Sequence, residues 1–362
     1  MHGSRRGRVL PRKQKNDQTR LDVTNKHRRF PYAAIAAAVW LAAFAPPGHA
    51  EPSGEIQIFI ENDFLAGTDR YYSNGLKIGF GAQPEAWPAP VRRGLSTVFD
   101  WLRLRQDDDY KLGFFVGQNI YTPRDIRTSE AQPNDRPWAG WLYAGWALQH
   151  LTLEPRPVLD TLELNIGVIG PPALAKQVQT EWHKLIGAPE PRGWAHQLPT
   201  EPGLMLGYLR KIKFGNESVD VIPHAGVTVG TVMTFARAGG IVRLGKNLSG
   251  FGPDSVEVGG AMLQDTHAKD TSRAGFEYYL FAGFDARAVA YNVFLDGNFF
   301  RSSPGSGVNR KPVVYDAVVG LSIRYDKWRA ALTQIRRSEE FSSNGIGSGR
   351  QTFHSLNFGL EF

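Results

Sequence analysis

Stretches in which apolar and polar residues alternate recur along this chain from residue 55 to its C-terminus. Alternation with a period of two is typical of β-strands, because successive side chains point to opposite faces of a sheet. Turn-forming glycine, asparagine and proline residues separate the stretches. The pattern predicts strands near residues 55–62, 71–82, 111–121, 139–150, 159–169, 203–214, 218–230, 234–245, 275–286, 288–299, 312–325, 328–337 and 351–362.

The length and composition of these strands favour an antiparallel barrel that crosses a membrane. Strands of about ten residues, dense aromatic side chains and one apolar face are what such a barrel requires. In the last strand, Leu356, Phe358 and Leu360 share one face, and the chain ends on the aromatic Phe362. This ending resembles the assembly signal of bacterial outer-membrane barrels. We therefore expect an all-β transmembrane antiparallel β-barrel; a secreted β-sandwich and a lipocalin-like barrel are the alternatives.

The expected number of strands is about twelve, although the pattern marks thirteen ranges. Bacterial barrels nearly always have an even number of strands, so either one strand is divided in two or a loop hairpin is counted. We expect residues 51–362 to form a single barrel domain with a helical extracellular loop.

The first predicted hairpin has a polar tip on a half-apolar body. Ile58 and Ile60 share one face of its first strand, which ends in Asn62 and Asp63, and Ser73 follows the turn. These three polar side chains offer hard oxygen atoms of the kind that bind calcium or magnesium. Capping of the turn by the same side chains is the other interpretation.

A helix is predicted over residues 172–187, inside a predicted loop. Gln179 and His183 are four residues apart and so lie on one face of it, while Val178 and Trp182 can pack elsewhere. A histidine beside a glutamine can hold and deprotonate a water molecule, as general-base catalysis requires. A structural or incidental histidine is the alternative.

A second helix is predicted over residues 89–105. Its helical spacing gives an apolar face that consists of Leu95, Val98, Phe99 and Leu102. This segment is either an interfacial helix on the membrane surface or a capped insertion in a turn.

Residues 1–50 have the features of an export signal. A basic stretch precedes an apolar run from Tyr32 to Ala45, which is too short to span a bilayer, and small residues lead to a mature start near Glu51. A membrane anchor is the alternative. The leader holds ten of the 42 basic and two of the 35 acidic residues, which leaves 32 against 33. The high pI therefore gives no reason to expect nucleic-acid binding.

Other common catalytic patterns do not occur in the sequence. The chain has no cysteine, which excludes disulfides, thiolate metal sites and cysteine nucleophiles. It contains no phosphate-binding glycine loop, no HExxH helix and no G-x-S-x-G elbow. Tyr71 stands two residues before Ser73, where outer-membrane phospholipase A has a histidine, so a serine nucleophile is not expected.

The sequence from Glu55 to Phe362 resembles the lipid A 3'-O-deacylase family of outer-membrane barrels. The resemblance rests on several blocks in the family's order: Glu61-Asn62-Asp63, Tyr72-Ser73-Asn74-Gly75, Gly117-Gln118-Asn119-Ile120-Tyr121-Thr122-Pro123, Asp135-Arg136-Pro137-Trp138-Ala139-Gly140-Trp141, Ile166-Gly167-Val168-Ile169-Gly170-Pro171, Gln177-Val178-Gln179 through His183 to Ile186-Gly187-Ala188, Gly193-Trp194 and Gln197-Leu198.

This resemblance implies a twelve-stranded barrel in a Gram-negative outer membrane, with its active site at the outer leaflet. It implies calcium-dependent (Ca²⁺) hydrolysis of the ester that holds the 3'-acyloxyacyl group of lipopolysaccharide. The expected partners are lipid A and the outer-membrane assembly machinery, and we expect a monomer that binds no nucleic acid. By resemblance, His183 is the general base that activates water, and Gln179 lies beside it.

The remaining site residues also follow from the resemblance. Asn62 and Asp63 would orient the base or bind the metal, and Ser73 stands where the family can have threonine. Pro189 occupies a position where the family can have glutamate, so Glu190 becomes the candidate third metal ligand. A family lysine has no clear counterpart, and the candidates for its substrate contact are Arg124 and Arg127.

Two other functions remain open from the sequence. One is a catalytically silent barrel that acts as a pore or a structural protein. The other is an esterase of the same fold that acts on phospholipid.

Overall fold

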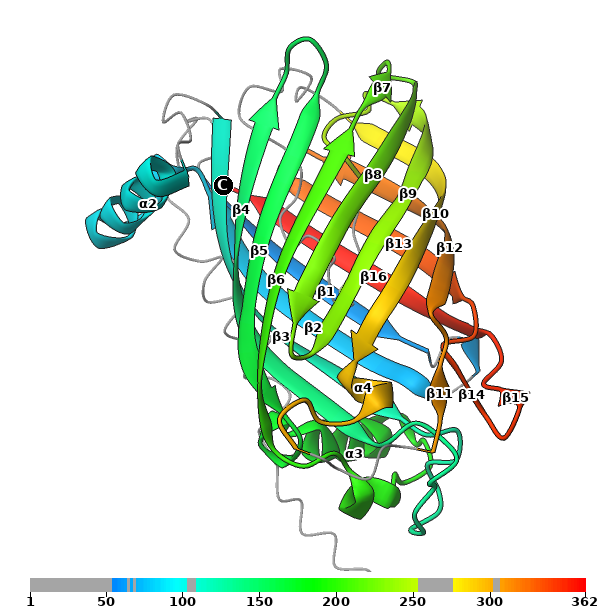
Figure 1. Cartoon of the computed structure of the whole chain (residues 1–362). Coiled ribbons are helices and arrows are strands. Elements are labelled where there is room, and N and C mark those ends of the chain that lie inside the picture. Colours follow the sequence, from blue (N-terminus) through cyan, green and yellow to red (C-terminus); the bar gives the residue numbers. More distant parts are fainter. Residues whose placement is uncertain (1–53, 64–65, 68–69, 103–108, 253–275, 302–306) are drawn as a thin grey trace, which may run out of the picture. The chain divides into compact units, whose positions relative to one another are not determined.

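The computed structural model describes residues 54–63, 66–67, 70–102, 109–252, 276–301 and 307–362. The predicted targeting segment lies outside these residues. Within them, twelve long antiparallel strands form a closed barrel (Figure 1). These strands are β1 (Gly54–Asn62), β2 (Tyr71–Ala82), β3 (Asp109–Thr122), β4 (Ala139–Thr152), β5 (Val158–Ile169), β6 (Glu201–Ile212), β8 (Val219–Gly230), β9 (Met233–Lys246), β10 (Glu277–Asn292), β12 (Val313–Tyr325), β13 (Trp328–Arg337) and β16 (Gln351–Glu361).

Each strand pairs with its neighbour in the chain, and the pairing of β1 with β16 closes the barrel. Short elements occupy the connections: β7 (Phe214–Gly215), β11 (Asn309–Arg310), β14 (Phe341–Ser343) and β15 (Ile346–Gly347), with the helices α2 (Ala89–Leu102), α3 (Ala175–Ile186) and α4 (Val293–Asp296) and the 3-10 turns η2 (Pro84–Ala86), η3 (Pro171–Ala173) and η4 (Gly193–His196). None of the helices in the described ranges has the length and apolar character needed to cross a bilayer.

The expected number of barrel strands is confirmed, and one predicted boundary is wrong. A single strand, β10 (Glu277–Asn292), runs from the first of the ranges 275–286 and 288–299 into the second, where helix α4 follows it. A register shift between Val289 and Tyr291 interrupts the ladder near its end. Asn292 then stops the strand, because its side-chain oxygen accepts a hydrogen bond from Phe294 N at 3.0 Å and so caps α4.

The alternating residues separate into an apolar outer face and a mixed inner face. Leu244 and Leu280 are each 61% exposed, whereas their strand neighbours Arg243 and Tyr279 are buried inside the barrel. Lipid-facing apolar residues that alternate with lumen-facing polar ones are the pattern of a transmembrane barrel. The pattern therefore assigns each strand residue to the lipid side or to the lumen.

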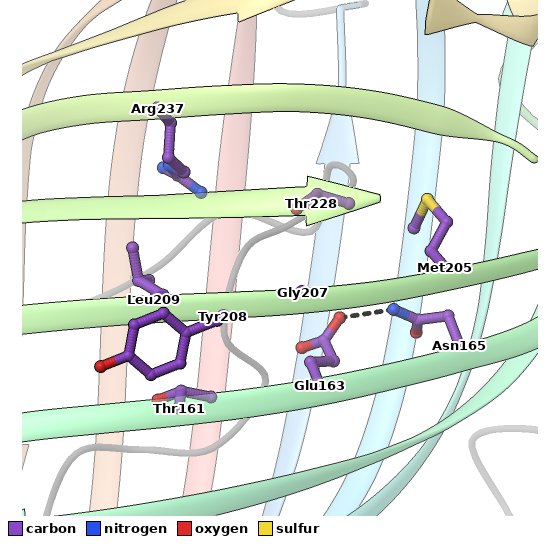
Figure 2. A pocket seen from close by; sticks show the side chains of 9 residues that line it. All are labelled: Thr161, Glu163, Asn165, Met205, Gly207, Tyr208, Leu209, Thr228 and Arg237. Carbon is purple, nitrogen blue, oxygen red and sulfur yellow. Dashed lines mark hydrogen bonds between the residues drawn. The ribbon is translucent and has the colours of Figure 1, made fainter. Parts of the chain in front are cut away.

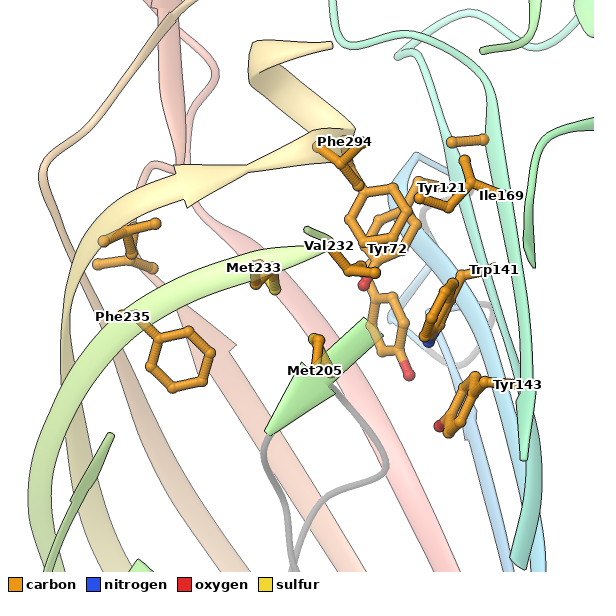
Figure 3. Close-up of a cluster of buried hydrophobic side chains, with 14 of the residues drawn as sticks. Tyr72, Tyr121, Trp141, Tyr143, Ile169, Met205, Val232, Met233, Phe235 and Phe294 are labelled. Carbon is orange, nitrogen blue, oxygen red and sulfur yellow. The ribbon is translucent and has the colours of Figure 1, made fainter. Parts of the chain in front are cut away.

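Aromatic side chains fill the lumen near helix α4 (Figure 3). We call this the loop end of the barrel; it carries α3 and α4 and lies opposite the C-terminus (Figure 1). Tyr121 stacks on Phe294 of α4 with ring centroids 3.9 Å apart. Trp141 stacks on Tyr143 at 5.2 Å, and a Cβ atom at Gly203 would lie 2.0 Å from the Trp141 ring. Glycine at that position lets the indole lie across the lumen.

The opposite end of the lumen is filled by the segment that follows β9. Leu248 and Phe251 of this segment are buried, and Arg243 donates hydrogen bonds to the carbonyl oxygens of Ser249 and Gly250 at 2.9 and 3.0 Å. The Arg243 guanidinium also bonds both carboxylate oxygens of Asp220, at 2.8 and 2.6 Å. Packed side chains therefore occupy both ends of the barrel.

Helix α2 confirms the helix predicted over 89–105, within narrower bounds. Val91 and Arg93 on it are exposed. The proposed apolar face of Leu95, Val98, Phe99 and Leu102 lies outside the described side chains. Its role as an interfacial helix stays a prediction.

Candidate functional site

The polar tip predicted from the first hairpin is formed by the ends of β1 and β2. Asn62 pairs with Asn74, and the register shifts between Tyr72 and Asn74, so that Ser73 is an extra residue in β2. Such a bulge re-aims side chains locally. Here it directs the Ser73 hydroxyl to Thr122 of β3, with the two oxygens 2.7 Å apart.

Hydrogen bonds hold each predicted tip residue in place. Asn62 Nδ2 donates to the Ser73 carbonyl oxygen at 3.0 Å, which directs its amide oxygen away from that strand. Asp63 is buried, and its Oδ2 accepts a hydrogen bond from Arg70 N at 2.9 Å across the loop between β1 and β2. The tip therefore presents an amide and a carboxylate in fixed positions.

The side chain of Asn62 is on the outer, lipid-facing side of the wall. It follows Ile58 and Ile60 in the alternation of β1, and Ile60 is exposed while Phe59 and Glu61 are buried in the lumen. The residues that pair with it across the sheet share that face. The tip is thus part of the surface that meets lipid.

The loop between β5 and β6 folds back over this same outer face. Gln118 of β3 donates a hydrogen bond from Nε2 to the carbonyl oxygen of Ala173 at 2.6 Å. Ile120, two residues further along β3, packs with Ala175 in a buried cluster. A Cβ atom at Gly140 would lie 2.5 Å from the Ala175 Cβ, so glycine permits the start of α3 to lie against the wall. The loop helix therefore covers strands β3 and β4 from outside.

Helix α3 buries Gln179 and His183 and exposes a row of large apolar side chains beside its charged residues. Ala175, Gln179 and His183, at spacings of four, are its buried residues. The large apolar side chains on its other sides are exposed: Leu174 by 49%, Val178 by 42%, Trp182 by 43% and Leu185 by 66%. On a water-soluble protein such an apolar row would normally pack against the core. Its exposure fits a helix at the membrane, where the exposed apolar side chains meet acyl chains.

The ring of His183 is oriented by the backbone of Pro189. His183 Nδ1 lies 2.5 Å from the Pro189 carbonyl oxygen, which can only accept a hydrogen bond. Nδ1 must therefore carry the proton, and in the neutral imidazole Nε2 then carries the lone pair. A carbonyl that fixes the tautomer in this way prepares Nε2 to accept a proton from water.

Gln179 lies on the same buried face of α3 as His183, as predicted. Its Oε1 accepts a hydrogen bond from Trp194 Nε1 at 3.0 Å, and the Trp194 ring packs against Trp138. These contacts tie α3 to the turn η4. A role for Gln179 in holding the attacking water stays a prediction.

The structure brings α3 and the hairpin tip to the same stretch of the outer wall. Ile120 packs against α3 on one side and pairs with Asn74 on the other, and Asn74 pairs with Asn62. Adjacent strands are about 4.8 Å apart, so Asn62 is about 10 Å from the strand that α3 contacts. Helix α3, which carries His183, and the Asn62 amide thus border one lipid-facing area, and the buried Asp63 follows Asn62 in the chain.

The other predicted ligands are not gathered there. Glu190 is exposed, and its carboxylate lies 3.6 Å from Arg192 Nε. Arg127 is exposed, and its backbone N donates to Asp125 Oδ1 at 2.9 Å. The structure therefore leaves the metal and substrate roles of Glu190 and Arg127 as predictions.

Arg124 holds two loops together. Its Nε and Nη2 donate to the Tyr71 hydroxyl at 3.2 and 3.1 Å, and Nη2 also donates to the Ser348 carbonyl oxygen at 3.0 Å. The hydrogen bond to Tyr71 raises the already high pKa of the Arg124 guanidinium, which stays charged. These contacts give Arg124 a structural role at the loop end, and its contact with substrate stays a prediction.

The chemistry of the tip residues suits a hard cation. An amide oxygen from Asn62 and a carboxylate from Asp63 are the donor types that calcium prefers. No group of three or more histidine, aspartate or glutamate side chains in the described part of the chain is arranged to hold a metal ion. Any site at this tip would combine the two side chains with other oxygen donors.

Two polar residues of this area, Gln118 and Thr122, had no assigned role in the sequence analysis. Both alternate with Val116, which is exposed on the outer face of β3, so they belong to the lipid side of the wall. A polar residue on an otherwise apolar strand face was the signal that could have identified them.

A recess inside the barrel is separate from this area (Figure 2). Its lining comes from β5, β6, β8 and β9, and Asn165 Nδ2 donates to Glu163 Oε1 within it at 2.8 Å. It contains none of the predicted site residues.

Comparison with known proteins places this fold in a family. A family model described as "Outer membrane protein LpxR" matches residues 32–362. LpxR from Salmonella typhimurium is 21% identical and aligns with a TM-score of 0.66, over 85% of this chain and 100% of that one. The β domain of the Bordetella autotransporter BrkA is 9% identical, with a TM-score of 0.41 over 86% of this chain and 100% of that one. The search of curated proteins found no match.

The family match covers nearly the whole described chain, and the Salmonella structure shares its barrel fold. The chain belongs to the LpxR family, the lipid A 3'-O-deacylase family of β-barrel proteins in the outer membrane of Gram-negative bacteria.

Proposed function

We propose that this protein is a calcium-dependent lipid A deacylase that hydrolyses the ester of the 3'-acyloxyacyl group at the outer leaflet. The observation that carries the proposal is helix α3, whose buried face bears His183 and which exposes the apolar side chains of Val178, Trp182 and Leu185. A base held between a barrel wall and a lipid-facing helix suits a substrate that stays in the membrane. The family of the chain supports lipid A as that substrate.

His183 is the proposed general base. Its Nδ1 donates to the Pro189 carbonyl oxygen, so Nε2 accepts a proton from water while the water oxygen attacks the ester carbonyl carbon. The bond between that carbon and the sugar oxygen then breaks, and the proton on Nε2 passes to the sugar oxygen. The products are a free hydroxyl group on the glycolipid and a fatty acid.

Asn62 and Asp63 would hold the calcium ion. Their side chains are fixed by Ser73 O and Arg70 N, and both belong to the tip that borders the outer wall. When bound, the cation supplies a positive charge that stabilises the oxyanion of an ester under attack. The fixed positions of the two side chains keep their oxygen donors directed in the absence of substrate.

The aromatic cluster at the loop end argues against the alternative of an open pore. Tyr72, Tyr121, Trp141 and Phe294 are buried within the lumen, where a channel would need water. The same-fold esterase that acts on phospholipid remains as an outcome of the experiment below.

The proposal is tested by expressing the full chain in a Gram-negative host with defined lipid A and analysing its lipids by mass spectrometry. Wild type is expected to remove the 3'-acyloxyacyl group. His183→Ala is expected to lower the rate about 100-fold or more, as for loss of a general base. His196→Ala is the matched control, because His196 is an exposed histidine in the same loop.

Three results would contradict parts of the proposal. Unchanged lipid A with a folded wild-type barrel and calcium present rules out the deacylase. Lysophospholipid in place of deacylated lipid A identifies the phospholipid esterase. Activity of His183→Ala equal to that of the control removes the base assignment.

A further inference from the structure

The outer face of the wall is also polar on the two strands beyond β1, which are β16 and β13. Asn62 pairs with His354, and His354 pairs with Gln334. Two residues nearer the loop end, Arg336 pairs with Thr352. Directly paired residues of antiparallel strands share a face. These polar groups therefore extend sideways from Asn62 along the wall.

Neighbouring residues show that this face is the lipid side. On β13, Ile335 is buried in the lumen, whereas Gln334 and Arg336 are exposed. On β16, Phe353 belongs to the aromatic cluster in the lumen, so His354 points to the other side of the wall.

Asn62, His354 and Gln334 form a row of paired residues across β1, β16 and β13. This row lies further from the loop end of the barrel with each strand beyond β1. Asn62 is the last residue of β1, but beyond Gln334 the row reaches Val319 in the middle of β12. Strands of a barrel are tilted, so a line across them descends through the membrane. His354 and Gln334 are therefore nearer to the acyl chains than Asn62 is.

The polar groups of His354, Gln334 and Arg336 lack partners among the described residues that would offset the cost of placing them on the lipid side. His354 Nδ1 is inaccessible to solvent and has no hydrogen-bond partner there. Gln334 and Arg336 form no side-chain hydrogen bond or ion pair in the described ranges. By contrast Arg337, on the lumen side of the same strand, bonds both oxygens of Asp316 at 2.8 and 2.6 Å.

Polar groups that face lipid without protein partners are expensive, and they commonly have a functional role. A phosphate group pairs well with a guanidinium, and ester or amide carbonyls accept hydrogen bonds from an amide or an imidazole. Arg336 is nearest the loop end of the three, and Gln334 and His354 lie two residues further from it along β13 and β16. This order matches the layers of a phosphorylated, acylated sugar.

We propose that Arg336, Gln334 and His354 form a substrate subsite on the lipid-facing wall, in which Arg336 binds a phosphate group of the glycolipid and the other two bind its acyl-linkage carbonyls. The subsite rests on the proposed function, because it positions the lipid whose ester reaches Asn62 and His183. Two strand spacings separate Arg336 from β1, about 10 Å, which a phosphorylated sugar can span.

The test measures hydrolysis of bisphosphorylated and dephosphorylated lipid A by the purified full chain in lipid bilayers. Arg336→Ala is expected to raise KM about tenfold for the phosphorylated lipid, with kcat retained, as for loss of a charge-assisted hydrogen bond. Its KM for the dephosphorylated lipid is expected to equal that of wild type. His354→Leu is expected to raise KM about threefold for both lipids. Arg156→Ala is the control, because Arg156 is an exposed arginine between β4 and β5, at the opposite end.

A binding measurement separates the subsite from the reaction. Native mass spectrometry of the His183→Ala protein, with and without Arg336→Ala, counts bound lipid A of each kind. Equal binding and equal KM with and without Arg336 overturn the subsite and leave the deacylase standing. A wild-type protein that binds phosphorylated lipid A through Arg336 but never cleaves it keeps the subsite and overturns the deacylase.

Discussion

Charged residues on the lumen face of the barrel wall are paired with one another, whereas polar residues on its outer face near Asn62 point toward lipid. Inside, Asp316 accepts hydrogen bonds from Arg287 and Arg337, and in the loops at the same end Glu340 accepts one from Arg136. Outside, His354 Nδ1 has no partner among the described residues. Asp316 and Glu340 thus each have an ion-pair partner, whereas Gln334 and Arg336 on the outer face have none among the described residues.

This difference distinguishes two uses of polar residues in one barrel. Paired charges that fill a lumen stabilise the fold and need no ligand. Polar groups on the lipid side, where burial is most costly, indicate that a ligand completes their hydrogen bonds. Changes to the lumen set should therefore alter stability, and changes to the outer set should alter activity.

The largest effect is expected from Asp316→Ala in the lumen. It removes the shared partner of Arg287 and Arg337, whose guanidinium nitrogens lie 2.9 and 2.6 Å from Asp316 Oδ2. Breaking a buried ion pair costs about 3–5 kcal/mol. Urea unfolding of the barrel in lipid, followed by tryptophan fluorescence, should show this loss, while activity per folded molecule is retained. Exposed Glu130→Ala is the control, and lost activity at unchanged stability would contradict the comparison.

On the outer wall, removal of calcium by a chelator is expected to lower lipid A hydrolysis about 100- to 1,000-fold, with restoration by calcium. Asp63→Asn should have a similar effect, because it removes the charge but keeps an acceptor for Arg70 N. Its unfolding midpoint should stay near that of wild type. Full activity in chelator would show that the reaction needs no calcium.

Leu185→Ser tests the exposed apolar face of α3. Removing this side chain from contact with acyl chains costs about 1.5–3 kcal/mol, so turnover of bilayer lipid A should fall about tenfold. Turnover of detergent-dispersed lipid should change little. Lys184→Ser, at an exposed polar position on the same helix, serves as the control. Equal losses of turnover in bilayers and in detergent would mean that Leu185 does not contact acyl chains and that α3 only positions His183.

The smallest effect is a pH dependence of stability. Burial alone would raise the pKa of Glu340, but Arg136 and Arg337 outweigh it and hold the pKa below its ordinary value of 4.5. The ionised carboxylate therefore contributes stability that is fully present above that value and is lost as pH falls through the lowered pKa. The melting temperature of wild type should drop by about 2–4 °C relative to that of Glu340→Gln over this acid range. Parallel plots of melting temperature against pH for the two proteins would exclude a contribution of the Glu340 carboxylate to stability.

Much of the barrel and part of the site could be predicted from local pattern. Alternation gave most strand ranges, and the four-residue spacing of Gln179 and His183 placed both on the buried face of α3. These features depend on neighbouring residues of one element. A strand boundary such as that of β10 was harder, because the capping of α4 by Asn292 interrupts a continuous apolar pattern.

The contacts between distant strands could not be read from the sequence. His354 is 292 positions from Asn62 and became its partner only through the closure of the barrel. The orientation of Ser73 depends on a bulge opposite β3, which alternation does not reveal. The spacing on α3 also left open where Val178 and Trp182 pack, since their exposure depends on how the helix lies against the barrel wall.

The packed lumen has a consequence for the cell that makes this protein. A barrel whose interior is filled by Tyr121, Trp141 and Phe294 near one end and by Phe251 near the other offers solutes no wide passage. Copies of this barrel would therefore add no wide aqueous channel to the outer membrane. A deacylase of the kind proposed, with its site on the outer face of the wall, would act on the envelope without opening a channel through it.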